Sequence, residues 1–177
     1  MLDVAVAYNR YKFLGFEFLT WLWYSIEENR EVFNTIEPEL TVLEIGNRLV
    51  LENRVQDALE SITIKGDDAG LEEGLIALRK GAVVTEMNLI SKFGDNEWRL
   101  TLKGESFDIA GLKTPESGPL ETSEDIEGRL LEKVFLDEKA IQLVDKLYRY
   151  FIRLRISNDW NETVVPRLRK WLHGKES

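Results

Sequence analysis

Apolar and aromatic side chains are concentrated in FLGFEFLTWLWY, which begins at Phe13. Their spacing predicts a helix over 11–29 with only a narrow polar stripe. A helix that is apolar nearly all round must be covered on several sides. Two interpretations stay open: the helix is the centre of the core, or part of its aromatic face contacts a second subunit, where aromatic residues are favoured. The candidate residues for a subunit contact are Phe16, Trp21, Trp23 and Tyr24.

A first group of strands is predicted at 41–45, 48–52 and 58–64, where apolar and β-branched residues recur. Gly46-Asn47 lies between the first two of these segments. It predicts a two-residue hairpin turn, because glycine accepts the positive φ of a primed turn without steric cost.

A short helix is predicted after this group. Asp67-Asp68 is a suitable N-cap, and apolar residues follow at helical spacing over 71–80. Gly81 is the expected end of the helix, because glycine is favoured just beyond a helix C-terminus.

A second group of strands is predicted at 83–93, 98–103 and 106–112, with a four-residue hairpin loop at 94–97. Apolar and polar residues alternate along WRLTLK at 98–103. This strand therefore has one apolar and one polar face, which is typical of an antiparallel sheet.

Beyond a linker or surface loop at 113–125, which is rich in proline, glycine and acids, one long helix is predicted over 126–156. Its predicted apolar side consists of Ile126, Leu130, Val134, Ile141, Val144, Tyr148, Phe151 and Leu154. A last helix is predicted over 160–172. Asp159 and Glu162 have the spacing of a capping box, and Pro166 implies a kink or a late start.

The order of elements is helix, strands, helix, strands, helix, helix, without strict βαβ alternation. It predicts an α+β fold in which antiparallel sheet packs with the aromatic N-terminal helix and the long C-terminal helices. We expect a single domain over 1–177, with a subdivision at the 113–125 loop as the alternative.

Composition narrows the class of protein. Of 177 residues, 44% are hydrophobic and 31% charged, which is ordinary for a globular chain with its own core. The chain has no cysteine, so disulfides, thiolate metal sites and a cysteine nucleophile are excluded. No apolar run reaches the roughly 18 residues that a membrane span needs. We expect a cytoplasmic protein without a membrane contact.

Catalytic patterns are scarce. His173 is the one histidine of the chain, which excludes a histidine metal cluster, and we expect it to be exposed. No nucleotide-binding glycine loop or nucleophile elbow is present. Acidic runs such as 121–125 are typical of solvated loops and are not by themselves evidence of a metal site. Because no catalytic or cofactor-binding pattern is found, we expect no enzyme activity, no metal and no cofactor. A metal-dependent nuclease stays open as a minor alternative.

Charge is unevenly distributed. The net charge is −9, but the segment 146–175 carries +6, which leaves −15 for the rest of the chain. Cationic side chains at spacings of three and four can follow a phosphate backbone. The alternative is an ordinary solvated helix face, with cations favoured near helix C-termini. The candidate DNA-binding residues are Arg149, Arg153, Arg155, Arg167, Arg169 and Lys170.

Four segments together resemble one family. They are FLGFEFLTWLWY (13–24), LRKGAVVTEMNL (78–89), EWRLTLKG (97–104) and EGRLLEKVFLDEKAIQLVD (127–145). They resemble the short bacterial branch of the recombination-associated RdgC proteins, over about 11–172. The most particular pieces are the G-x-E-F-L-T-W-L-W pattern and the VVTE strand.

The resemblance implies a non-enzymatic protein that binds double-stranded DNA without marked sequence preference. Members of the longer branch form a closed dimeric ring around DNA and restrain strand exchange, and they are acidic overall. This chain is much shorter than that branch, and no DNA-contacting residue of the family is carried over to it. The resemblance also implies a homodimer at the nucleoid and recombination proteins as partners.

Our leading hypothesis is therefore a DNA-binding protein that affects recombination or replication. The alternative is an acidic protein-interaction module, an adaptor or inhibitor whose surface meets a basic partner without binding nucleic acid. The acidic body and the acidic loop over 116–127 motivate it.

Overall fold

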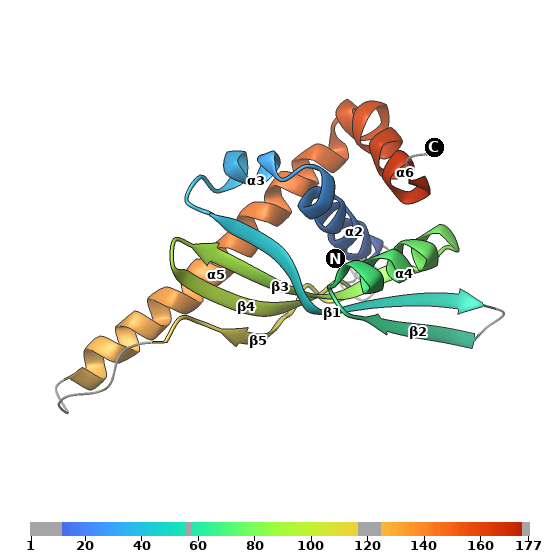
Figure 1. The fold of residues 1–177 in the computed structure, drawn as a ribbon. Helices are drawn as coiled ribbons and strands as arrows, with labels where there is room; N and C mark the ends of the chain where they lie inside the picture. The colour runs from blue at the N-terminus through green and yellow to red at the C-terminus, as the bar shows by residue number, and fades with distance from the viewer. Residues whose placement is uncertain (1–11, 56–57, 117–124, 175–177) are drawn as a thin grey trace, which may run out of the picture.

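The structure is a computed structural model that describes residues 12–55, 58–116 and 125–174. It contains both helices and strands, and the first and last described elements are helices (Figure 1). In chain order the elements are α2 (Phe13–Glu28), α3 (Glu31–Ile36), β1 (Val42–Val55), β2 (Ala58–Ile64), α4 (Asp68–Arg79), β3 (Val83–Phe93), β4 (Asn96–Lys103), β5 (Ile109–Lys113), α5 (Asp125–Ile156), the π-helix η1 (Trp160–Val164) and α6 (Val165–His173).

The strands form one antiparallel sheet in the order β2-β1-β3-β4-β5 (Figure 1). Along β4, Trp98, Leu100 and Leu102 are buried, while the residues between them are exposed or half-buried. One face of the sheet is therefore apolar and covered, as the alternation of WRLTLK predicts. The predicted α+β class with antiparallel sheet is confirmed.

The core is built around α2. Phe18, Trp21 and Trp23 are at most 1% exposed. The Phe18 ring meets Tyr148 of α5 edge-on at 5.4 Å, and the Trp21 ring stacks on Tyr150 at 5.9 Å. The core interpretation of the aromatic helix is confirmed, because α5 and the sheet cover it on different sides.

The predicted hairpin at Gly46-Asn47 is wrong. β1 runs without a turn from Val42 to Val55, and its pairing with β3 shifts between Ile45 and Leu49. A Cβ on Gly46 would lie 1.9 Å from the Asn88 side-chain oxygen. The glycine therefore marks an irregularity of the sheet and a close approach between two strands, which are the other common reasons for a glycine within a strand.

The other strand predictions differ less. β2 and β3 have the predicted bounds. The loop between β3 and β4 has two residues instead of four, because Phe93 pairs with Asn96. The last strand begins at Ile109 instead of Ser106, after a turn in which Phe107 has a φ of 60°.

The short helix is confirmed with a slightly earlier start. α4 begins at Asp68, and the Asp67 side chain accepts a hydrogen bond of 2.9 Å from the backbone N–H of Gly70. Gly81 follows the helix with a φ of +96°, which is the left-handed conformation expected for a glycine at this place.

The C-terminal helices are only partly as predicted. α5 ends at Ile156, but the capping box is wrong, since Asp159 has helical φ and ψ and its side chain makes no capping bond. The chain instead forms the π-helix η1, and α6 starts at Val165 with Pro166 in its first turn. Proline lacks an N–H, so a helix starts more easily there than it continues.

The predicted linker lies mostly outside the described residues. Only 113–116 and Asp125 of the segment 113–125 are described. The buried apolar residues of the described part, from Phe18 to Trp171 and apart from Val50, form one hydrophobic cluster. The single domain, and a subdivision at this loop, stay predictions.

Candidate interaction surfaces

The aromatic residues predicted for a subunit contact lie inside the chain. Trp21 and Trp23 are 1% and 0% exposed, and Tyr24 is also buried. Phe16 is half-buried and packs near Gly104. A side chain with almost no exposed area cannot contact a second subunit. Trp21, Trp23 and Tyr24 therefore belong to the core of their own chain.

The carboxylate of Glu27 joins α2 to α6. Its two oxygens accept hydrogen bonds from the indole N–H groups of Trp23 at 2.6 Å and Trp171 at 2.8 Å. From α4, the Arg79 side chain donates to the carbonyl oxygen of Leu172 at the end of α6. These contacts hold α6 against α2 and α4, and they determine which side of α6 faces solvent.

Two of the six predicted DNA-binding residues are engaged by carboxylates. Arg149 forms an ion pair of 2.7 Å with Asp145 on the same helix. Arg155 forms an ion pair of 2.6 Å with Glu17, and its guanidinium lies 5.2 Å from the centre of the Trp160 ring. Both arginines are therefore partly neutralised within the chain, which the helical spacing alone did not indicate.

The other four residues form no ion pair within the described ranges. They are all exposed and come from the end of α5 and from α6, which lie at the same end of the molecule (Figure 1). We call them the α5–α6 basic set: Arg153, Arg167, Arg169 and Lys170.

Two members of the set share a depression. Arg167 and Lys170 line a cavity of about 330 Å³ together with Tyr24, Glu28 and Trp171. Arg167 is hydrogen-bonded to the Tyr24 hydroxyl. Burial raises the pKa of Tyr24 above 10.0, and the nearby Arg167 opposes that shift. The depression thus offers two cations and a neutral hydroxyl, with one carboxylate in its wall.

A larger cavity of about 700 Å³ lies between α2, β1 and α4. Its charged lining residues are Glu27, Arg30, Glu44, Asp68 and Glu72. Within the described ranges no three or more histidine, aspartate or glutamate side chains are grouped to hold a metal ion. His173 is exposed on α6, as predicted.

A surface that the sequence analysis missed lies on the first half of α5. Six large apolar side chains there are between 47% and 66% exposed. We call them the α5 stripe: Ile126, Leu130, Leu131, Val134, Phe135 and Ile141. Four of them belong to the predicted apolar side of the helix. On that side Val144 and Phe151 are buried, whereas these four are exposed.

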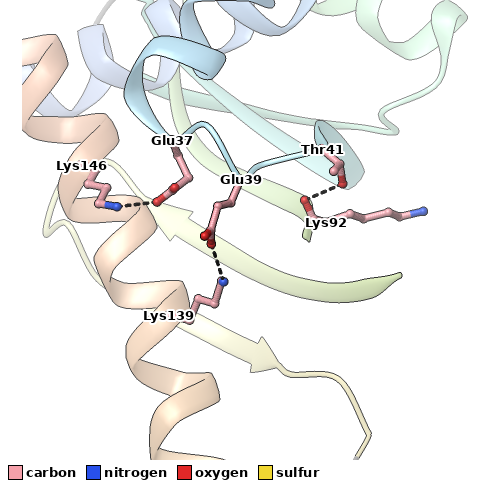
Figure 2. Close-up of polar contacts among 6 residues, drawn as sticks. All are labelled: Glu37, Glu39, Thr41, Lys92, Lys139 and Lys146. Atoms are coloured by element: carbon pink, nitrogen blue, oxygen red, sulfur yellow. Dashed lines mark hydrogen bonds and ion pairs between the residues drawn. The ribbon is translucent and has the colours of Figure 1, made fainter. Parts of the chain in front are cut away.

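The part of α5 from Ala140 onward is instead the part that packs. Its buried residues are Ala140, Leu143, Val144, Leu147 and Phe151. On a neighbouring side, Lys139 and Lys146 form ion pairs with Glu39 and Glu37 of the segment before β1 (Figure 2). The apolar spacing of the sequence could have revealed two apolar sides of this helix, but not which of them the sheet and α2 would cover.

No helix in the described part of the chain is long and apolar enough to cross a membrane. Comparison with protein-family models, with curated proteins and with solved structures yields no match to this chain. The resemblance to the RdgC proteins therefore stays a prediction that rests on the sequence segments alone.

Proposed function

We propose that this chain is a non-catalytic protein that binds double-stranded DNA without sequence preference. The observation that carries the proposal is the α5–α6 basic set: four exposed cations, on α5 and α6, that form no ion pair with a described carboxylate. Exposed arginine and lysine side chains that are not neutralised by a carboxylate are available to phosphate oxygens. The acidic remainder of the chain repels DNA, so the basic set is where a duplex is expected to contact it.

The resemblance to the RdgC proteins supports the same proposal and adds its biological setting. On this proposal the protein acts as a homodimer at the nucleoid in the cytoplasm, affects recombination or replication, and has recombination proteins as partners. Nothing in this proposal requires a reaction, a metal or a cofactor, because duplex binding is obtained from charge and shape.

The first test is the salt dependence of binding to duplexes of unrelated sequence. If all four cations contact phosphates, the logarithm of the binding constant falls with the logarithm of salt with a slope of about −3.6. Raising salt from 50 to 200 mM then weakens binding on the order of 100-fold. Electrophoretic mobility shift or fluorescence anisotropy measures this slope. A flat response contradicts the proposal.

The second test is charge reversal with a matched control. The test variant reverses three members of the basic set: Arg153→Glu, Arg169→Glu and Lys170→Glu. The control reverses three other exposed lysines that also form no ion pair within the described ranges: Lys65→Glu, Lys103→Glu and Lys113→Glu. Both variants change the net charge equally, so we expect only the first to lose binding to every sequence about equally.

The outcome of this pair of variants separates the function hypotheses. If both lose binding equally, the effect is one of total charge and the site is wrong. If the wild type shifts no DNA at low salt but captures a basic protein after nuclease treatment, the chain is an interaction module instead.

A further inference from the structure

The α5 stripe is an apolar surface that no described residue covers. We propose that two copies of this chain associate through it, with the two α5 helices antiparallel about a two-fold axis. The proposal concerns self-association alone, and it holds whether or not the chain binds DNA.

The stripe and the buried side of α5 point in different directions. At about 100° per residue, Ile126, Leu130, Val134 and Ile141 lie within about 80° of one another around the helix, and Leu131 and Phe135 widen the stripe to about 180°. The buried residues of the range 140–151 are centred about 90° away from the first four. Five of the six stripe residues also precede Ala140, in turns of α5 that extend beyond the sheet (Figure 1). The helix therefore packs its later turns against its own chain and leaves the earlier turns uncovered by the described residues.

Contacts on other sides of α5 fix this rotation. The indole N–H of Trp98 donates a hydrogen bond of 3.0 Å to the carbonyl oxygen of Leu136. Lys139 forms an ion pair of 3.3 Å with Glu39, and Figure 2 shows this pair beside the one between Lys146 and Glu37. These contacts fix the rotation of α5 and therefore the direction of the stripe, whose edge at Phe135 lines a depression with Pro38 and Glu39.

The size of the stripe approaches half of a stable dimer interface. Six large side chains that are about half exposed, at ~200 Å² each, present roughly 600 Å² of apolar surface. A patch of this size is at the upper end of what monomeric proteins expose, and a specific interface buries about 800 Å² on each partner. The stripe therefore supplies most, though not all, of the area that such an interface buries.

A second copy fits the stripe by symmetry and by charge. An antiparallel pair brings Ile126 of one copy beside Ile141 of the other, so each stripe covers one of equal length, as a two-fold interface requires. The charged residues within 126–141 nearly cancel, to a net −1. Two copies therefore meet there with little repulsion, although each whole chain carries −9.

The mass of the protein in solution tests the proposal. Light scattering during gel filtration should give twice the 20.5 kDa of one chain. The double variant Leu130→Glu and Val134→Glu places charges at sites that are 63% and 47% exposed, so the fold of the single chain should persist in circular dichroism. We expect this variant to elute at the mass of one chain.

Leu59→Glu is the matched control, because Leu59 of β2 is 61% exposed and lies outside the stripe. This variant should keep the mass of the wild type. A wild type of single-chain mass at its highest soluble concentration, or a stripe variant that keeps the double mass, overturns the proposal. Binding of a different protein to the stripe by a monomeric wild type overturns it as well.

Engineered cysteines test the antiparallel arrangement directly, because the natural chain has none. In the proposed dimer the two Val134 residues lie near the axis, only about 1.5 Å apart along the helices, so Val134→Cys should form an intermolecular disulfide. The two Ile126 residues are about 22 Å apart along the helices. Ile126→Cys alone should therefore not cross-link, but it should cross-link to Ile141→Cys when the two variants are mixed. Cross-linking of Ile126→Cys with itself contradicts the arrangement.

Discussion

Ser25 is a buried polar residue in the last turns of α2. Its side chain is fully buried, and its hydroxyl is the one buried side-chain polar atom without a hydrogen-bond partner in the described part of the chain. A buried hydroxyl without a partner costs about 1–3 kcal/mol of folding free energy. The core therefore tolerates one group that lowers the stability of the protein.

Replacing Ser25 with alanine should raise the free energy of unfolding by about 1 kcal/mol, because the uncompensated hydroxyl is removed. Urea denaturation followed by tryptophan fluorescence measures the change. Thr85→Val is the control, since the Thr85 hydroxyl is also buried but donates to the carbonyl oxygen of Val50 at 3.3 Å. That variant should lose about 1 kcal/mol. If both variants shift stability in the same direction, our account of Ser25 is wrong.

At the scale of elements, the position of α6 depends on one carboxylate. Glu27 of α2 accepts hydrogen bonds from Trp23 of its own helix and from Trp171 of α6. The two indole rings also meet edge-on, with their centres 5.3 Å apart. Because three of the four residues of the α5–α6 basic set lie on α6, this carboxylate also positions most of the proposed DNA-binding surface.

Glu27→Ala should lower the free energy of unfolding by about 3 kcal/mol, since a hydrogen bond to a charged group contributes at least about 1.5 kcal/mol and two partly buried ones are lost. Denaturation curves and the emission of the two tryptophans report the change. Glu28→Ala alters the neighbouring exposed carboxylate and should stay within about 0.5 kcal/mol of the wild type. Equal losses for the two variants would show that Glu27 has no special role.

At the scale of the whole molecule, the α5–α6 basic set and the α5 stripe lie in different places. The cations of the basic set lie at the end formed by α6 and the last turns of α5, while the α5 stripe lies on the opposite half of the same helix (Figure 1). A helix of 32 residues is about 48 Å long, so the two surfaces do not compete for space. Self-association and DNA binding are therefore compatible on one chain.

Stability of the whole molecule should fall above pH 10. Burial raises the pKa of Tyr24 and of Tyr148 above 10.0 in the folded chain. The folded state then keeps phenol protons that the unfolded chain has released, so unfolding becomes easier as pH rises. The contribution is fully present below pH 10. Thermal melts between pH 8 and 11 measure this loss, and Tyr148→Phe should reduce its slope. An unchanged slope in that variant would contradict the assignment.

Much of the chain's local structure could be predicted from its sequence. Apolar alternation identified the buried face of β4, and Asp67 and Gly81 marked the two ends of α4 within a few residues. The prediction at Gly46-Asn47 was wrong, because a glycine between two apolar segments can have either of two causes. It can permit a turn, or it can avoid a clash with a distant residue, here Asn88.

The candidate surfaces could be predicted only in part. The cations of α5 and α6 were identified, but the partner of Arg155 is Glu17, 138 positions earlier in the chain. No local spacing reveals such a pair. Helical periodicity likewise showed that α5 has apolar residues along its length, but it did not show which of them are buried against other elements.

By itself, therefore, the sequence determined where most helices and strands form and which residues along each are apolar, because these depend on neighbours within a few positions. The tertiary structure decided which apolar side of α5 is buried, which arginines are neutralised, and that Trp21 and Trp23 belong to the core of their own chain. These outcomes depend on contacts between distant segments, and burying one side of a helix necessarily leaves the other side to solvent or to a partner.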